Sequence, residues 1–170
     1  REIGKDEWEA FFDLCMENNC ETGGVFSSMC EEDVCEIIRD PYCIVGSDGL
    51  TRSWKEKGHP RASGTFPHAI TFFVKEKGIL TLEQVIHKMT GLTAECLSVK
   101  NKGRIRDGYD ADLLIFDYER LKDTATYSNP NSITEGIDYV FVNGELVWHD
   151  GQFTGLTPGR MLCHWERREG

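Results

Sequence analysis

The sequence has no long hydrophobic run and too little positive charge to balance its acids. No stretch approaches the roughly 18 uninterrupted apolar residues of a membrane-spanning helix, so we expect no membrane span. Lysine and arginine number 19 against 29 aspartates and glutamates, which gives a formal net charge of -10 at pH 7. Nucleic acids and anionic membrane surfaces carry charge of the same sign, so we predict neither as a partner. A small anionic substrate is compatible with this balance, because it needs only one local cation.

The common motifs of phosphate, serine-nucleophile and zinc sites are also missing. The sequence contains no G-x-x-x-x-G-K-[ST], no G-x-S-x-G and no C-x-x-C. Its five histidines never occur as H-x-H or H-E-x-x-H. Outside the loop discussed below, we expect the histidines to be structural or solvated, namely His68, His87, His149 and His164.

The seven cysteines allow two interpretations. Cys15-x4-Cys20 and Cys30-x4-Cys35 permit a four-thiolate metal site. The odd count and irregular spacing favour the alternative, in which the cysteines are reduced, mostly buried thiols of a cytoplasmic protein.

Residues 1–50 alternate between helical and strand patterns. Apolar residues at i, i+3, i+4 and i+7 from Trp8, after a capping-box spacing at Asp6, predict one helix. A second capping-box spacing at Ser28 predicts another helix, which Pro41 stops. Short apolar runs at 24–27 and 42–45 read as strands, the second buried on both faces. Such alternation indicates a parallel α/β sheet or barrel.

The rest of the chain changes from helix to antiparallel strands. Residues 67–99 have helical spacing, with a capping box at Thr81 and a break at Gly91. After Lys100 we predict a strand at 112–116 and then a hairpin around Asn143-Gly144, the strongest short signal for a type I′ turn. Further turns are predicted at Asp107-Gly108 and Asp150-Gly151. The C-terminal third should therefore be antiparallel β structure.

One candidate functional residue follows the predicted strand at 42–45. Asp48 lies just past the C-terminal end of that strand, where parallel α/β folds place their chemistry. There it can act as a general base or as a carboxylate beside a metal. Ser47-Asp48-Gly49 is also good turn-forming chemistry, so a purely structural role stays open.

A second candidate is the guanidinium in His59-Pro60-Arg61. Pro60 restrains His59 to extended geometry, which would hold both polar side chains on a stiff loop. Arginine in such a position suits two-point capture of a carboxylate, while a solvated surface arginine is the alternative. One carboxylate and one guanidinium do not make a complete active site.

Five stretches together resemble one family. They are "VGSDG", "GHPR.SGTFP", "LTLEQVIHKMTGLTAECL", "KGRIRDGYDADLLIFD" and "VFVNGELVWHDGQFTGLTPGR". From about Trp8 to Arg160 they resemble, in order, the N-acyl-D-amino-acid deacylases, including D-aminoacylases, of the amidohydrolase superfamily. The S-D-G followed by H-P-R and G-T-F points to this group and away from hydantoinases and dihydroorotases.

The resemblance implies an α/β fold in two parts. Residues 1–99 would be the last βα units of a metal-dependent TIM-type amidohydrolase barrel. Residues 100–165 would be part of a small antiparallel β-sandwich, and residues 166–170 a tail.

It also implies a reaction and a set of roles. A zinc-dependent enzyme with one or two Zn²⁺ ions would hydrolyse the amide bond of an N-acyl-D-amino acid to a D-amino acid and a carboxylate. Asp48 would lie by the zinc, as a weak ligand at most, take a proton from the metal-bound water and pass it to the leaving amine. Arg61 would pair with the substrate's α-carboxylate, and His59 and Ser47 would also bind the substrate.

Three departures from the family pattern qualify this prediction. Ser63 stands where relatives carry an aromatic residue before G-T-F, and His68 stands where an arginine is frequent after F-P, so the substrate preference should differ. The family's main zinc ligands are an upstream H-x-H, a bridging cysteine and two further histidines, and none is in these residues. We therefore hypothesise a C-terminal fragment of a longer deacylase, inactive alone.

Two other functions compete with this one. The first is a hydantoinase-like or dipeptidase-like amidohydrolase, which acts on a different amide. The second is a non-catalytic assembly module that self-associates through exposed sheet edges.

Overall fold

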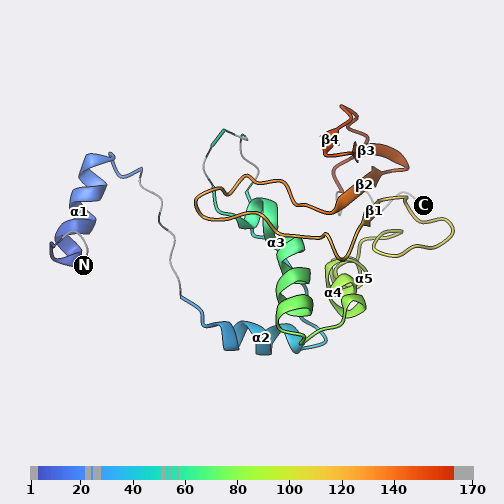
Figure 1. Cartoon of the computed structure of the whole chain (residues 1–170), viewed down its shortest axis with the longest axis horizontal. Helices are drawn as coiled ribbons and strands as arrows, with labels where there is room; N and C mark the ends of the chain where they lie inside the picture. Colours follow the sequence, from blue (N-terminus) through green and yellow to red (C-terminus); the bar gives the residue numbers. More distant parts are fainter. Residues whose placement is uncertain are drawn as a thin grey trace. The chain divides into compact units, whose positions relative to one another are not determined.

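The computed structural model describes residues 4–21, 24, 28–50, 53, 55–56 and 58–162. The chain forms two compact units, Arg1–Cys30 and Glu31–Gly170. Figure 1 shows the elements of each unit along the chain. Residues 25–27 of the strand predicted at 24–27, His164 and the predicted tail at 166–170 lie outside the described residues.

The first unit contains one helix, α1, at Glu7–Glu17. It begins as predicted, because the Asp6 carboxylate accepts a hydrogen bond from the backbone N–H of Trp8 at 3.0 Å. The predicted apolar face is present, and α1 buries none of its residues. Trp8, Phe11 and Phe12 are 66%, 53% and 59% exposed.

The second unit opens with α2 at Glu31–Arg39, which ends before Pro41 as expected. Its start at Glu31 corrects the prediction that Ser28 caps the helix. Three acids fill the first turn, where their negative charges interact favourably with the positive end of the helix dipole. Ile38 is buried in the core, and Val34 and Cys35 pack against it.

The strand predicted at 42–45 is not formed. This segment has no regular secondary structure and is held by the end of α4, Leu82–Met89. Lys88, 5% exposed, donates its Nζ protons to the carbonyls of Asp40 and Cys43, and the Val45 N–H donates to the Lys88 carbonyl. A strand needs a neighbouring strand for its ladder, and the described residues provide none beside this segment.

Helix α3 spans Arg61–Ile70 and continues into a π-helix, η1, at Thr71–Glu76. It starts six residues earlier than position 67, so Arg61 is the first residue of a helix and not part of a loop. The reason is the backbone of Pro60, whose φ of -56° is also the helical value.

The core of the second unit lies where α2, α3, η1 and α4 meet the chain around Leu121. Its buried apolar residues are Ile38, Ala69, Ile70, Phe73, Leu80, Val85 and Leu121. The predicted capping box of α4 is confirmed, with Thr81 and Gln84 bonded in both directions. Gly91 begins α5, Gly91–Cys96, so the predicted break there is also confirmed.

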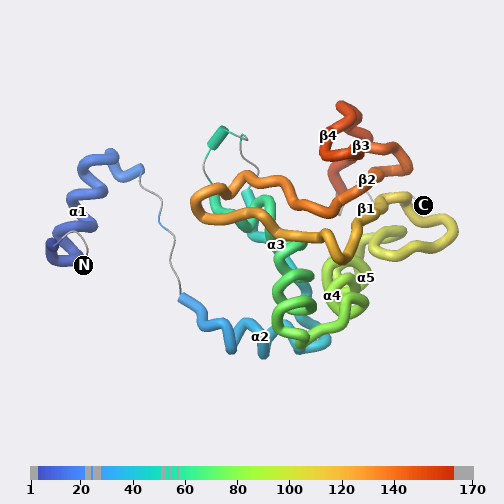
Figure 2. Tube along the Cα trace, in the orientation of Figure 1, coloured from blue at the N-terminus to red at the C-terminus, as the bar shows by residue number. Residues whose placement is uncertain are grey.

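The C-terminal part is a four-stranded antiparallel sheet of β1 (Leu113–Phe116), β2 (Ile137–Val142), β3 (Glu145–His149) and β4 (Gln152–Phe153), in that order. The I′ turn is confirmed, because Asn143 and Gly144 have φ of 48° and 81°. In Figure 2 the chain between β1 and β2 leaves the sheet, runs towards the N-terminal end of α3 and returns. An α/β chain with a small antiparallel sheet is therefore confirmed.

None of the helices in the described part of the chain has the length and apolar character that crossing a membrane requires.

Candidate functional site

Ser47-Asp48-Gly49 forms a tight local turn. The Ser47 hydroxyl accepts a hydrogen bond from the Gly49 N–H at 3.1 Å, and Asp48 has a left-handed φ of 48°. A side chain on Gly49 would place its Cβ 3.1 Å from the Cα of Ala62. Glycine therefore lets this turn lie directly against the first turn of α3. The structural role left open from the sequence is real, and it also fixes where Asp48 points.

The turn brings Asp48 to Arg61. The Nη2 of Arg61 lies 3.1 Å from an Oδ2 of Asp48, and the two side chains are 42% and 85% exposed. A surface pair with this much water around it contributes little to stability, so either group can exchange its partner at low cost. The two residues with predicted chemistry are thus brought together.

His59 supports the backbone of Arg61. Its Nδ1 accepts a hydrogen bond from the Arg61 N–H at 3.1 Å, so Nδ1 carries no proton and the ring can donate only from Nε2. The ring also meets Tyr127 edge to face, with centroids 5.1 Å apart. His59 thereby links the start of α3 to the chain between β1 and β2.

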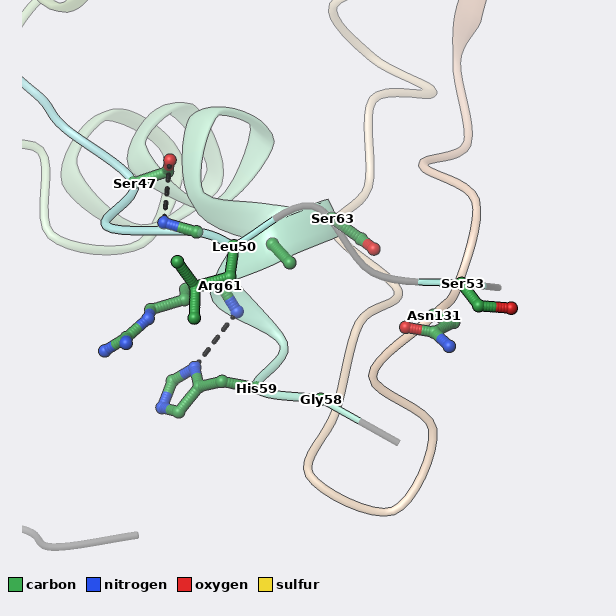
Figure 3. A pocket seen from close by; sticks show the side chains of 10 residues that line it. Ser47, Leu50, Ser53, Gly58, His59, Arg61, Ser63 and Asn131 are labelled. Atoms are coloured by element: carbon green, nitrogen blue, oxygen red, sulfur yellow. Dashed lines mark hydrogen bonds between the residues drawn. The ribbon is translucent and has the colours of Figure 1, made fainter. Parts of the chain in front are cut away.

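A cavity of about 320 Å³ lies beside these groups. Ser47, His59 and Arg61 line it, together with Ser63, Leu50 and Asn131 among others, and their contact with a substrate stays a prediction. Asp48 is not part of the lining and reaches the site through Arg61. Figure 3 shows His59 and Arg61 joined by their hydrogen bond, with Asn131 and Ser53 on the other side of the cavity.

His68 does not line this cavity. Its Nδ1 lies 3.1 Å from an Oδ2 of Asp123, whose side chain is 14% exposed, and its ring stacks on Phe72. These contacts agree with the structural or solvated role expected of His68, and its predicted effect on substrate preference stays a prediction. His149 also stacks in the sheet, on Tyr139. Ser63 does line the cavity, and an effect of its small side chain on substrate preference stays a prediction.

Comparison with known proteins gives the family. The amidohydrolase family model matches residues 27–147. The chain belongs to the amidohydrolase family. Among curated proteins, the chain is 41% identical to the N-acyl-D-aspartate deacylase of Alcaligenes xylosoxydans xylosoxydans over 163 residues. The match covers 95% of this chain and 31% of that protein. The resemblance to N-acyl-D-amino-acid deacylases is thereby confirmed.

Two solved structures agree with this amidohydrolase assignment. A D-aminoacylase studied for its binuclear metal centre matches with a TM-score of 0.78 and 36% identity, over 91% of this chain and 31% of that one. An N-acyl-D-glutamate deacylase from Bordetella bronchiseptica, in complex with zinc and a phosphonate that mimics the tetrahedral intermediate, matches with a TM-score of 0.68 and 35% identity, over 73% and 26%. The chain spans about a third of the length of the curated relatives it matches.

The amidohydrolase segment described here does not assemble a metal centre. Within the described residues, no three histidine, cysteine or acidic side chains are grouped to hold an ion. Three of the four cysteines in the four-thiolate interpretation, Cys15, Cys20 and Cys30, lie in the first unit and form no such group within it, while Cys35 belongs to the second unit. Asp48 can offer one carboxylate oxygen to a metal, which is less than a zinc site requires.

Two site residues escaped the sequence analysis. Asn131 donates its Nδ2 proton to the carbonyl of Glu56 at 2.8 Å and lines the cavity, while Tyr127 contacts His59. Both lie far along the chain from the S-D-G and H-P-R motifs. Their surroundings, "TYSNPNS", indicate only a turn-rich connection, so no local pattern announces their role.

Proposed function

We propose that this chain is the C-terminal part of a zinc-dependent amidohydrolase that hydrolyses N-acyl-D-amino acids to a D-amino acid and a carboxylate. The observation that carries the proposal is the Arg61 guanidinium beside the cavity, already bound to a carboxylate 3.1 Å away. The relatives described above include an N-acyl-D-aspartate deacylase and an N-acyl-D-glutamate deacylase, which support the proposal.

Within that enzyme we assign residues 1–99 to the last βα units of a TIM-type barrel. Residues 100–165 would belong to the β-sandwich, and residues 166–170 to a tail. The helices up to Cys96 and the antiparallel strands after Leu113 support this division. Six cysteines of the described chain are free, which supports the reducing environment of the cytoplasm.

Arg61 binds the substrate's α-carboxylate in this proposal. A guanidinium offers two parallel N–H donors to a carboxylate, and here it faces a cavity that also contains the Ser47 hydroxyl and the His59 ring. All N-acyl-D-amino acids have this carboxylate. Arg61 therefore fixes the common end of the substrate, while other walls of the cavity, including Ser63, meet the variable side chain.

Asp48 handles the proton. When a substrate carboxylate takes its place on Arg61, the Asp48 carboxylate is released and can accept a proton from the attacking water. It then donates that proton to the amine nitrogen as the C–N bond breaks, which regenerates the carboxylate. Substrate binding and release of the base are thus coupled through one guanidinium.

Zinc would polarise the amide carbonyl and lower the pKa of a bound water. The described residues supply only Asp48 towards it, so no step above depends on the geometry of a metal. The remaining ligands must come from outside these residues.

A substrate panel tests the proposal. The complete deacylase that carries this sequence should release D-amino acids from N-acyl-D-amino acids in a zinc-dependent reaction, and should be inactive on hydantoins and dihydroorotate. The 170-residue chain should have no activity alone. Preferential hydrolysis of cyclic amides would replace this function with that of a cyclic amidohydrolase.

Self-association is a second candidate, and one observation favours it. Strand β1 is an edge of the sheet, and its Leu113, Leu114 and Ile115 side chains are 36%, 51% and 49% exposed. A second copy of the chain can pair with such an edge. Sedimentation of the chain without zinc would show a stable dimer if this candidate is correct, and a monomer if it is not.

A further inference from the structure

The chain between β1 and β2 contains a closed loop at residues 122–135, which we name the clamp loop. Its ends are joined by a β-bridge in which Lys122 and Glu135 exchange backbone hydrogen bonds, both at 3.1 Å. Thr126 and Asn129 likewise exchange backbone hydrogen bonds nearer the tip. Loops closed and packed in this way are compact surface structures that often carry function.

Side chains brace the inside of the clamp loop. The Thr124 hydroxyl donates to the Ile133 carbonyl at 2.7 Å and accepts from the Ser132 hydroxyl at 2.7 Å. Pro130 is buried. The loop therefore has a defined shape without being part of the sheet. Fixing one end of the loop therefore also fixes where its other end lies.

The clamp loop is anchored on α3. Asp123 pairs with His68, and its other carboxylate oxygen accepts from the Ala125 N–H at 3.0 Å. The contact is close because Gly64 has no side chain, since a Cβ there would lie 2.5 Å from the Asp123 carboxylate and 3.0 Å from the Ala125 side chain. Glycine at position 64 of this helix is explained by this approach.

The far part of the clamp loop reaches the site. The Tyr127 ring meets the His59 ring in an edge-to-face contact, and the Nδ1 of His59 accepts the hydrogen bond from the Arg61 N–H. Asn131 holds the carbonyl of Glu56, which precedes these two residues in the chain. The segment with His59 and Arg61 is thus fixed from outside at two points, although its own secondary structure begins only at Arg61.

From this arrangement we propose that the clamp loop positions the carboxylate-binding arginine, with Tyr127 and Asn131 as its positioning residues. Neither residue takes part in bond making. Tyr127 acts through His59 on the backbone of Arg61, and Asn131 acts through Glu56 on the preceding turn. The proposal rests on the function assigned to Arg61 above.

The test uses the complete deacylase with Tyr127→Leu, and with Tyr127→Phe as the conservative variant. Tyr127 is 66% exposed, so neither change should unfold the protein. An edge-to-face ring contact corresponds to about a two- to ten-fold effect, so Tyr127→Leu should raise KM by that factor with kcat unchanged. Tyr127→Phe, which keeps the ring, should behave like the wild type, as should Ser128→Ala on the same loop.

A double variant separates positioning from a general structural role. With Arg61→Met in place, Tyr127→Leu should change KM little further, because the group it positions has gone. Asn131→Ala should raise KM in the same direction. Additive effects of the two changes, an unchanged KM in Tyr127→Leu, or failure of Tyr127→Phe to restore it would each overturn the proposal.

A measurement that does not depend on enzyme activity separates this test from the test of the proposed function. Hydrogen exchange of the Arg61 backbone amide should become faster in Tyr127→Leu, because His59 loses its ring contact there. Exchange should stay slow in Tyr127→Phe, because that variant keeps the ring contact. If the enzyme releases no D-amino acid, the function fails while this exchange still decides the clamp. Equal exchange in both variants would overturn the clamp even in an active enzyme.

Discussion

Two ion clusters of this amidohydrolase chain are built differently. Asp48 and Arg61 meet at one contact of 3.1 Å, with the carboxylate 85% exposed. Lys102 lies between Asp110 and Asp112, is 18% exposed, and Asp112 also accepts the Asn143 N–H at 2.8 Å. The first pair is easily opened, and the second ties the turn at 101–112 to the β2–β3 hairpin.

The difference also appears in the titration of the second cluster. The hydrogen bond from Lys102, followed by that from the Asn143 N–H, lowers the pKa of Asp112. Burial on its own would lower the pKa of Lys102, but its hydrogen bonds to Asp112 and Asp110 outweigh this and raise it. Shifted pKa values here mark a structural tie, whereas the pair proposed for chemistry is the exposed one.

The largest effect should follow removal of the Asp48 carboxylate. If the proposed function is correct, Asp48→Asn should reduce kcat of the complete enzyme by about 10²- to 10⁴-fold, the usual contribution of a general acid–base group. Its stability should hardly change, because this side chain is so exposed. D-amino acid release and thermal unfolding measure the two quantities. A reduction below ten-fold would make Asp48 a turn residue without a role in proton transfer.

The next effect concerns the partner of that carboxylate. Arg61→Met should lower kcat/KM for an N-acyl-D-amino acid by about 10- to 100-fold, the range for a lost charge-assisted hydrogen bond. The corresponding N-acyl-D-amino amide has no carboxylate to displace Asp48 from the guanidinium, so its hydrolysis should not decrease in Arg61→Met. Arg61→Lys keeps the charge without the two-point geometry and should fall between the wild type and Arg61→Met. Equal losses on acid and amide would mean that Arg61 does not recognise the carboxylate.

The first cluster was predictable from the sequence because its residues lie in two nearby motifs with their own chemistry. Asp48 and Arg61 were identified from S-D-G and H-P-R, and the I′ turn from Asn143-Gly144. Local signals of this kind also gave α1, α4 and the break at Gly91. They depend on residues close in the chain, so one sequence is enough to find them.

Long-range contacts were not predictable in this way. The segment at 42–45 has the composition of a buried strand, yet it is held by Lys88 of α4. Pro60 was taken to extend a loop, although its φ suits a helix start equally well. The contacts of Tyr127 and Asn131 with the site depend on how a loop packs on α3, and no pattern within that loop encodes the packing.

A smaller effect, on stability, tests the close approach of the clamp loop. Gly64→Ala would force a Cβ against Asp123 and should destabilise the protein by about 1–3 kcal/mol, as overpacking does. Gly46→Ala is the matched control, because a Cβ there meets nothing within 4 Å, and it should be neutral or slightly stabilising. Urea unfolding of both variants measures the difference. Equal stabilities would show that the loop can move away from α3 without cost.

The smallest effect is the pH dependence contributed by Asp112. Because folding lowers the pKa of this carboxyl, its contribution to stability is complete above the ordinary aspartate pKa of about 3.9 and is lost as the pH falls through the lower, folded value. The cluster is partly exposed, so the contribution should be at most about 1 kcal/mol. Asp112→Asn should therefore be less stable than the wild type at pH 6 and approach it as the pH falls towards 2. Asp107→Asn, on the neighbouring exposed turn, controls for the loss of one negative charge. A stability difference between Asp112→Asn and wild type that stayed constant from pH 6 to pH 2 would assign the effect to the shape of the side chain and not to its charge. The two clusters would then differ in packing alone.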